Sequence, residues 1–255
     1  MAGHSQFKNI MHRKGAQDAK KAKIFTKLIR EIIVSVKTGQ PDPQFNSRLR
    51  NAIIAAKKAS MPKDKIDSAI KKGSSAAEGD NYEEVRYEGY APGGVAVIVD
   101  ALTDNRNRTA SEVRAAFTKF GGSLGEMGSV SFMFERVGYI EYPKAVASEE
   151  EMFEAALELG AEDCQSNENA HEIYTDAAKL NEVREGLAKK FGEAEEVKLT
   201  WKPLNTIPID QEKAPAIMKM IEMLEDSDDV QAVTANFDMT EEVMEALGFG
   251  PKSQV

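Results

Sequence analysis

Residues 137–142 read VGYIEY, residues 171–175 read HEIYT and residues 195–201 read EEVKLTW. These three segments have the apolar and β-branched content of strands, and a fourth strand is predicted near 163–167. Helices are predicted between them, from Ser148 to Leu159 and from Asp176 to Phe191. The order strand, helix, strand, strand, helix, strand is that of a ferredoxin-like α+β unit.

The segments on either side of this unit predict a second α+β domain. Residues 83–90 and 94–101 read as strands joined by a turn of sequence Ala-Pro-Gly-Gly. The sequence Thr-Ala-Ser-Glu at 109–112 matches a capping box, and it predicts a helix that ends at Gly121-Gly122. A further strand is predicted from Val130 to Phe134.

Residues 211–225 predict a helix and residues 230–237 a strand, and neither can bury its apolar face alone. We therefore expect both to return to the sheet that begins at residue 83, so that the ferredoxin-like unit is an insertion.

The N-terminal region predicts a small helical bundle. Apolar residues recur at three- and four-residue steps from Ala16, and Gly39 follows as a helix end. Asp42-Pro43 predicts the start of a second helix, and a third is expected after Pro62 with its end at Gly73. Residues 1 to about 15 have no apolar period, which predicts a mobile arm. Residues 73–81, GSSAAEGDN, have the composition of a linker.

The predicted fold is therefore α+β with three domains. A basic arm and helical bundle spans residues 1–75, and a split α+β domain spans 80–136 together with 205–245. A ferredoxin-like α+β domain, residues 137–204, is inserted into the split domain.

Charge is sorted along the chain. Residues 1–75 have a net charge of +12 and the remaining 180 residues have -21, which gives the overall -9. A basic end on an acidic chain is typical of proteins that bind nucleic acids or anionic membranes, and the acidic part would restrict such binding to one end. The alternative is a lysine-rich but merely solvated helical surface.

No enzyme motif is present. Cys164 is the single cysteine, and the three histidines, His4, His12 and His171, do not have metal-ligand spacing. We therefore expect no catalytic residue, no metal, no cofactor and no small-molecule substrate. Without an apolar run long enough to span a bilayer or to form a secretory signal, the chain is expected to be cytoplasmic, unprocessed and free of membrane contact.

Two segments have residues suited to anions. Residues 121–128, GGSLGEMG, are glycine-rich but follow a helix and precede a strand, so a backbone turn is the better interpretation than a phosphate site. Arg106 and Arg108 lie just before a predicted helix N-terminus, where a phosphate could bind. Equally, Asp104, Asn105 and Asn107 would form a turn and the arginines would pair with nearby acids.

Several motifs together resemble the YebC/PmpR family. They are MAGHS at the start, NI-x-HRK at 9–14, KIFTKLIRE at 23–31, YEGYAPGG at 87–94, DNRNRT at 104–109 and GSV at 128–130. The resemblance implies a three-domain regulator of gene expression without enzymatic activity. Bacterial members are described as DNA-binding transcriptional regulators, the mitochondrial relative as a translational activator of cytochrome c oxidase, and some bacterial members as ribosome-associated factors that relieve stalling at proline runs.

We therefore expect a nucleic-acid-binding regulator, a DNA-binding transcriptional regulator by the family resemblance. The alternatives are a ribosome-associated RNA-binding translation factor and a protein-interaction adaptor that uses the acidic domains. Lysine and arginine neutralise phosphates, which gives affinity with little sequence information. The candidate nucleic-acid-binding residues are Lys8, Arg13, Lys14, Lys20, Lys21, Lys23, Lys27 and Arg30, with Arg106 and Arg108 as a second contact.

Overall fold

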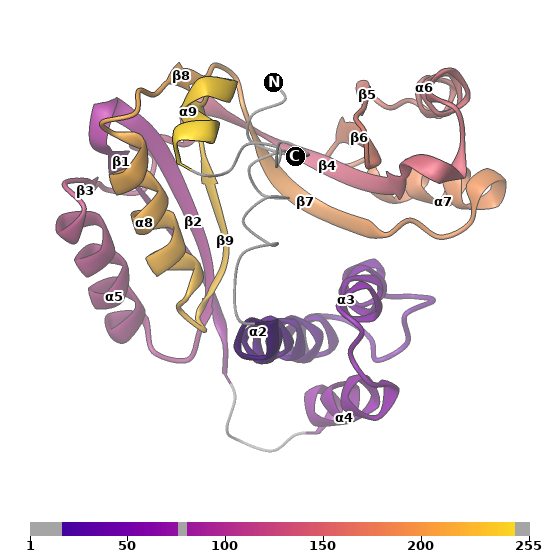
Figure 1. The fold of residues 1–255 in the computed structure, drawn as a ribbon. Helices are drawn as coiled ribbons and strands as arrows, with labels where there is room; N and C mark the ends of the chain where they lie inside the picture. Colours follow the sequence, from indigo (N-terminus) through magenta and orange to yellow (C-terminus); the bar gives the residue numbers. More distant parts are fainter. Residues whose placement is uncertain (1–16, 76–80, 248–255) are drawn as a thin grey trace. The chain divides into compact units, whose positions relative to one another are not determined.

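The structure is a computed structural model, and it describes residues 17–75 and 81–247 (Figure 1). Helices and sheets are both present, which confirms the predicted α+β class. The chain divides into two compact units. The first comprises Met1–Lys27, Glu78–Phe134 and Pro203–Val255, and the second Leu28–Ala77 and Glu135–Lys202. The three-domain division made from the sequence cuts the chain at different places and stays a prediction.

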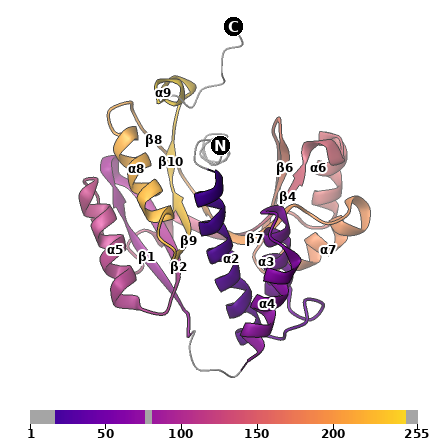
Figure 2. The same cartoon turned by 60° about the horizontal axis from the view of Figure 1, so that its bottom comes forward.

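Residues 17–75, the described part of the N-terminal region, form three helices, coloured indigo to violet in Figure 2. They are α2 (Gln17–Thr38), α3 (Ser47–Lys58) and α4 (Lys63–Ser74). The second helix starts later than predicted, because Asn46 and not Asp42 is its N-cap. The Asn46 side chain accepts a hydrogen bond from the Leu49 amide at 3.0 Å, whereas the Asp42 carboxylate accepts one from the Gln44 amide at 2.8 Å and so stabilises a turn.

Gly73 has a packing role that the sequence did not reveal. Helix α4 continues through it to Ser74, and Gly73 is buried. A Cβ atom there would lie 2.8 Å from Val36 Cβ and 3.0 Å from the Ile33 carbonyl oxygen. The missing side chain therefore allows α4 to approach α2 closely.

The first sheet has the strand order β3-β1-β2-β9. Its strands are β1 (Glu83–Ala91), β2 (Val95–Thr103), β3 (Ser123–Leu124) and β9 (Val230–Ala235), and a short helical turn, η1 (Pro92–Gly94), joins β1 to β2. Strand β9 pairs antiparallel with β2, and Val97 lies opposite Ala235. Segments far apart in the sequence therefore share one sheet.

Helices α5 (Arg106–Lys119) and α8 (Ala214–Glu225) lie side by side against one face of this sheet (Figure 1). Their apolar faces form one core with the strands, in which Val97, Val99, Phe117, Ile217 and Leu224 are at most 1% exposed. This core explains why α8 and β9 return to a sheet that begins far earlier in the chain.

The second sheet, in the second unit, has the order β5-β6-β4-β7. Its strands are β4 (Phe134–Pro143), β5 (Asp163–Ser166), β6 (Ala170–Asp176) and β7 (Glu196–Pro203), and its helices are α6 (Glu149–Glu158) and α7 (Leu180–Phe191). This order is that of a ferredoxin-like fold. Its core includes Ile140, Tyr142, Met152, Ile173 and Leu187, which are all fully buried.

The strand predicted from Val130 to Phe134 is wrong. Ser131–Met133 form a short 3-10 turn, η2, and strand β4 begins only at Phe134. The amides of Val130 and Ser131 donate to the Glu88 carboxylate instead, so they are not available for a strand ladder. The remaining short elements are η3 (Lys144–Val146), the parallel pair β8 (Ile207–Pro208) and β10 (Phe237–Asp238), and α9 (Glu241–Ala246).

Two helices start later than predicted because an aspartate forms a turn before each. The Asp176 carboxylate accepts from the Ala178 amide at 2.7 Å, and α7 begins only at Leu180. The Asp210 carboxylate accepts from the amides of Glu212 and Lys213, and α8 begins at Ala214.

Candidate nucleic-acid interface

Four of the ten predicted contact residues have no side-chain description. Lys8, Arg13 and Lys14 lie outside the described residues, and Lys20 is described only as part of the backbone of α2. Of the other four N-terminal candidates, Lys21 is exposed, and Lys23, Lys27 and Arg30 are partly buried. Arg30 also makes a contact within the protein.

Lys23 and Lys27 contact the end of α8, which is in the same compact unit. The Lys23 ammonium lies 2.8 Å from the Asp226 carboxylate, and Lys27 donates to the Glu225 carbonyl oxygen at 2.6 Å. Burial lowers the pKa of Lys27, although Glu225 and Asp228 oppose that shift. Two of the predicted phosphate ligands therefore neutralise the negative end of a helix. The Lys23 side chain is still 41% exposed, so its ion pair is weak.

Helices α3 and α4 have further exposed lysines that the sequence-based site did not include. Lys57, Lys63 and Lys71 are exposed, and none of them has an ion-pair partner among the residues that the structure describes. Residues 1–75 contain seventeen lysines and arginines, and the predicted contact residues include only eight of them. The net charge of +12 therefore already indicated further cations in this region.

Lys57 also lies at a groove with a volume of about 480 Å³ in the second unit. Ile53 and Ile54 line it together with Arg50, Lys58, Glu193 and Glu195. Lys58 pairs with Glu141 at 2.5 Å, and Arg50 pairs with Glu185 at 3.1 Å. Since both cations and carboxylates line it, the groove does not favour a polyanion.

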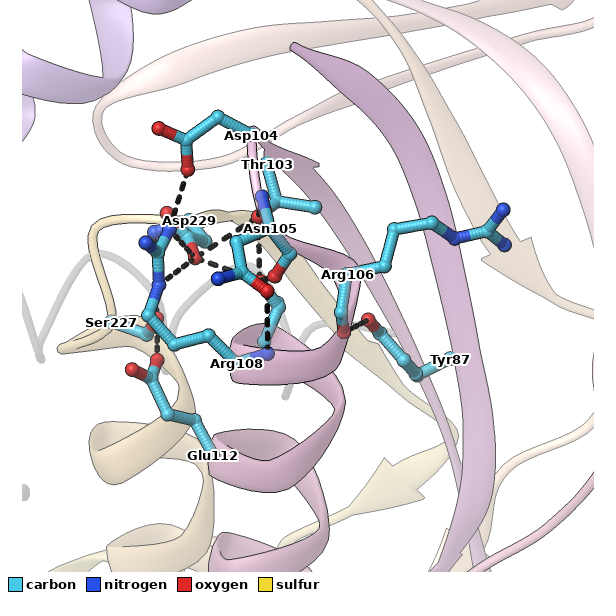
Figure 3. Close-up of polar contacts among 10 residues, drawn as sticks. Tyr87, Thr103, Asp104, Asn105, Arg106, Arg108, Glu112, Ser227 and Asp229 are labelled. Atoms are coloured by element: carbon cyan, nitrogen blue, oxygen red, sulfur yellow. Dashed lines mark hydrogen bonds and ion pairs between the residues drawn. The ribbon is translucent and has the colours of Figure 1, made fainter.

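Figure 3 shows the second predicted contact, around Arg106 and Arg108. Both arginines lie in the first turn of α5, whose N-cap is Asn105, and not before it. The Arg106 guanidinium points away from the polar cluster and is 59% exposed, with Glu83 at 3.5 Å. Arg108 turns inward, where it contacts Asp104 at 2.8 Å and the almost fully buried Asp229 at 2.7 Å. These two carboxylates raise the pKa of Arg108.

Thr109 does not start a capping box, so that prediction is wrong. Its hydroxyl donates to the Asp229 carboxylate at 2.7 Å and lies 2.8 Å from the Thr103 hydroxyl. Asp229 is thus the centre of a buried polar network that joins α5 to the segment before β9. The prediction that Arg106 and Arg108 bind phosphate stays untested, but Arg108 has internal acids as its partners.

The last glycine of this segment and the residues that follow it do hold an anion, and that anion belongs to the protein itself. The Glu88 carboxylate, on β1, is 1% exposed and accepts from the amides of Val130 at 2.9 Å and Ser131 at 2.8 Å. Burial alone would raise the pKa of Glu88, but these bonds and one from the Gly128 amide outweigh it, and the net pKa is lowered. A phosphate cannot use these amides while Glu88 occupies them.

His171 and Cys164 have structural surroundings. The His171 ring is fully buried between the Ser166 hydroxyl and the carbonyl oxygens of Lys144 and Ala147. Burial raises the pKa of Cys164 to about 11. Within residues 17–75 and 81–247, no group of three potential metal ligands occurs, and no helix has the length and apolarity needed to cross a bilayer.

The chain is thus an α+β protein with a basic helical region and acidic sheet-containing regions. The family model for the second and third domains of TACO1/YebC proteins, named Transcrip_reg, matches residues 82–237, and the model for their N-terminal domain matches residues 5–76. The chain belongs to the TACO1/YebC family.

A solved structure is also similar, that of the conserved hypothetical protein Aq1575 from Aquifex aeolicus. It is 55% identical in sequence with a TM-score of 0.83, and the match covers 91% of this chain and 96% of that one. The family places the chain among regulators and does not show which partner it binds.

Proposed function

We propose that this chain is a regulator of gene expression that binds folded RNA, such as ribosomal RNA, through its helical N-terminal region. The observation that carries the proposal is the concentration of positive charge in residues 1–75, with exposed lysines on α2, α3 and α4. Cations spread over three helices suit the irregular phosphate surface of a folded RNA.

A DNA-binding transcriptional regulator is the second candidate, and one observation favours it. Helices α3 and α4 are joined by residues 59–62 alone, a length typical of helix-turn-helix proteins, and Ser60 in that connection has a positive φ of 58°. Helix α4 would then be the helix that reads the major groove.

The composition of α4 argues against sequence-specific reading. Its sequence, KDKIDSAIKKGS, contains no arginine, asparagine or glutamine, the residues that read guanine and adenine most specifically. Asp64 and Asp67 are exposed beside its lysines and would repel DNA phosphates. Such a helix supports phosphate contact more than base recognition.

Binding across a salt series separates these functions. The full chain is titrated against a duplex DNA, a folded ribosomal RNA fragment and whole ribosomes between roughly 50 and 200 mM salt. We expect tighter binding to the RNA and the ribosome than to the duplex. Preference for one DNA sequence over both RNA probes would refute the RNA proposal in favour of the transcriptional one.

A double variant tests the surface itself. Lys57→Ala combined with Lys71→Ala is expected to weaken RNA binding and to reduce the slope of log K against log salt by about 2. Lys219→Ala is the matched control, because Lys219 is an exposed lysine on α8 in the acidic part of the chain. Equal effects of both changes would show that the helical region is not the contact surface.

A further inference from the structure

The loop 125–133 displays two large apolar side chains to solvent. Met127 is 72% exposed and Phe132 is 66% exposed. Leu204, 56% exposed, lies next to this loop, since its amide donates to the Met133 carbonyl oxygen at 2.9 Å. Single exposed apolar residues are common on protein surfaces. Three that are tied to one short loop need an explanation.

The loop that presents them is firmly held. The buried Glu88 carboxylate binds the amides of Val130 and Ser131, and the Glu88 carbonyl oxygen accepts from the Gly125 amide at 2.8 Å. The Tyr90 hydroxyl donates to the Ser129 carbonyl oxygen at 3.1 Å. Val130, between the two exposed side chains, is fully buried.

A fixed loop with apolar tips has the properties of a binding anchor. Its backbone loses little conformational freedom on binding, so most of the apolar burial contributes to affinity. Phenylalanine and methionine are enriched at protein interfaces. The buried Glu88 carboxylate holds a loop whose exposed side chains, Met127 and Phe132, contribute nothing to the core. This arrangement favours a role in recognition.

The net charge of the region that carries the loop indicates the partner. The described part of the first unit that forms the sheet and its helices, residues 81–134 and 203–247, has eighteen acidic and seven basic side chains, a net charge of -11. This charge repels nucleic acids, and it also repels a second copy of the same surface. A protein surface with lysines and arginines around an apolar pocket is complementary to it.

We infer that loop 125–133 is a docking site for a basic protein, with Phe132 and Met127 as the anchors that enter its apolar pocket. This contact is separate from the helical region and does not depend on its binding of RNA. It gives the chain two recognition surfaces of opposite charge, one for a polyanion and one for a polycation with an apolar centre.

The test uses the full chain and a fluorescent amphipathic peptide of leucine and lysine as the probe. Fluorescence anisotropy measures its affinity for the wild type, for Phe132→Ala and for Phe153→Ala. Phe153 is the matched control, a phenylalanine on α6 that is 44% exposed among several glutamates. We expect Phe132→Ala to weaken binding about tenfold or more and Phe153→Ala by less than about twofold.

Three further measurements distinguish a basic protein from other partners of this loop. A leucine–glutamate peptide is expected to bind much more weakly than the lysine peptide, and Phe132→Ala is expected to leave both oligonucleotide binding and the sedimentation coefficient unchanged. Equal effects of the two alanine variants would overturn the docking site. If Phe132→Ala lost oligonucleotide binding, the docking proposal would be wrong and Phe132 would instead stack on bases. If Phe132→Ala lost self-association, the loop would instead be a dimer contact.

Discussion

The carboxylate of Asp229 offers the sharpest test of how the first unit is held together. Its side chain is 4% exposed, and one oxygen accepts from the Arg108 guanidinium at 2.7 and 3.2 Å, from Thr109 at 2.7 Å and from Thr103 at 3.3 Å. This shared acceptor joins α5 to the start of strand β9. Asp229→Ala removes it.

The expected loss follows from these contacts. Breaking a buried ion pair by removing one partner costs about 3–5 kcal/mol of unfolding free energy. The Arg108 side chain is 43% exposed and water can replace part of its interaction, while Thr103 and Thr109 can still bond to each other at 2.8 Å. We therefore expect about 3 kcal/mol, the lower end of that range, which corresponds to a decrease in Tm of roughly 6–12 °C.

Urea denaturation at pH 7, followed by far-ultraviolet circular dichroism, measures this loss. Asp226→Ala is the control from the same turn, because Asp226 is 61% exposed and its ion pair with Lys23 should contribute less than about 1 kcal/mol. If both variants lose the same small amount of stability, the Asp229 network does not hold α5 to β9, and the hydrogen bond from Thr109 to Asp229 contributes little.

Three other outcomes follow from single side chains. Glu88→Gln should lower the free energy of unfolding at pH 6 by about 1–3 kcal/mol. Because the pKa of Glu88 is lowered in the folded chain, this contribution is lost as the pH falls below the usual glutamate range. Urea denaturation of both proteins at pH 3 should therefore give a smaller difference. Gly73→Ala should cost about 1–3 kcal/mol because its Cβ would meet Val36, and the exposed Ser68→Ala on the same helix should cost little in the same urea titration. Cys164, whose pKa is raised to about 11, should react with iodoacetamide slowly at pH 8 in the folded chain and fast in urea, as followed by mass spectrometry; fast reaction when folded would contradict its burial.

The elements predicted correctly are those decided by local pattern. The helix after Ser148 starts where expected, with Ser148 and Glu151 in a reciprocal capping box. The sequence Thr109–Glu112 has the same spacing, yet the Thr109 hydroxyl bonds to Asp229, 120 positions away in the chain. A sequence motif gives the donors and acceptors, but tertiary contacts select which of them pair.

The candidate surface shows the same limit. Lys21 and Lys23 are indistinguishable in the sequence, but only Lys23 contacts Asp226, because the end of α8 lies beside it. The exposed lysines of α3 and α4 contribute to the +12 charge of residues 1–75, so the sequence alone could indicate them. The anion held by the amides after the glycine-rich segment could not be predicted, since Glu88 is about forty residues away in sequence.

The pairing of β9 with β2 has a consequence for biosynthesis. Thr103 and Asp229, at the ends of these partners, are 126 residues apart, which a ribosome takes about 6–25 s to add at roughly 5–20 residues per second. During that interval the nascent β1–β2 hairpin has one unpaired edge, while the ferredoxin-like segment can already complete its own sheet. The order of synthesis therefore leaves one edge of the β1–β2 hairpin unpaired until β9 has been made. We expect aggregation of truncated chains to be most severe when they end just before Val230.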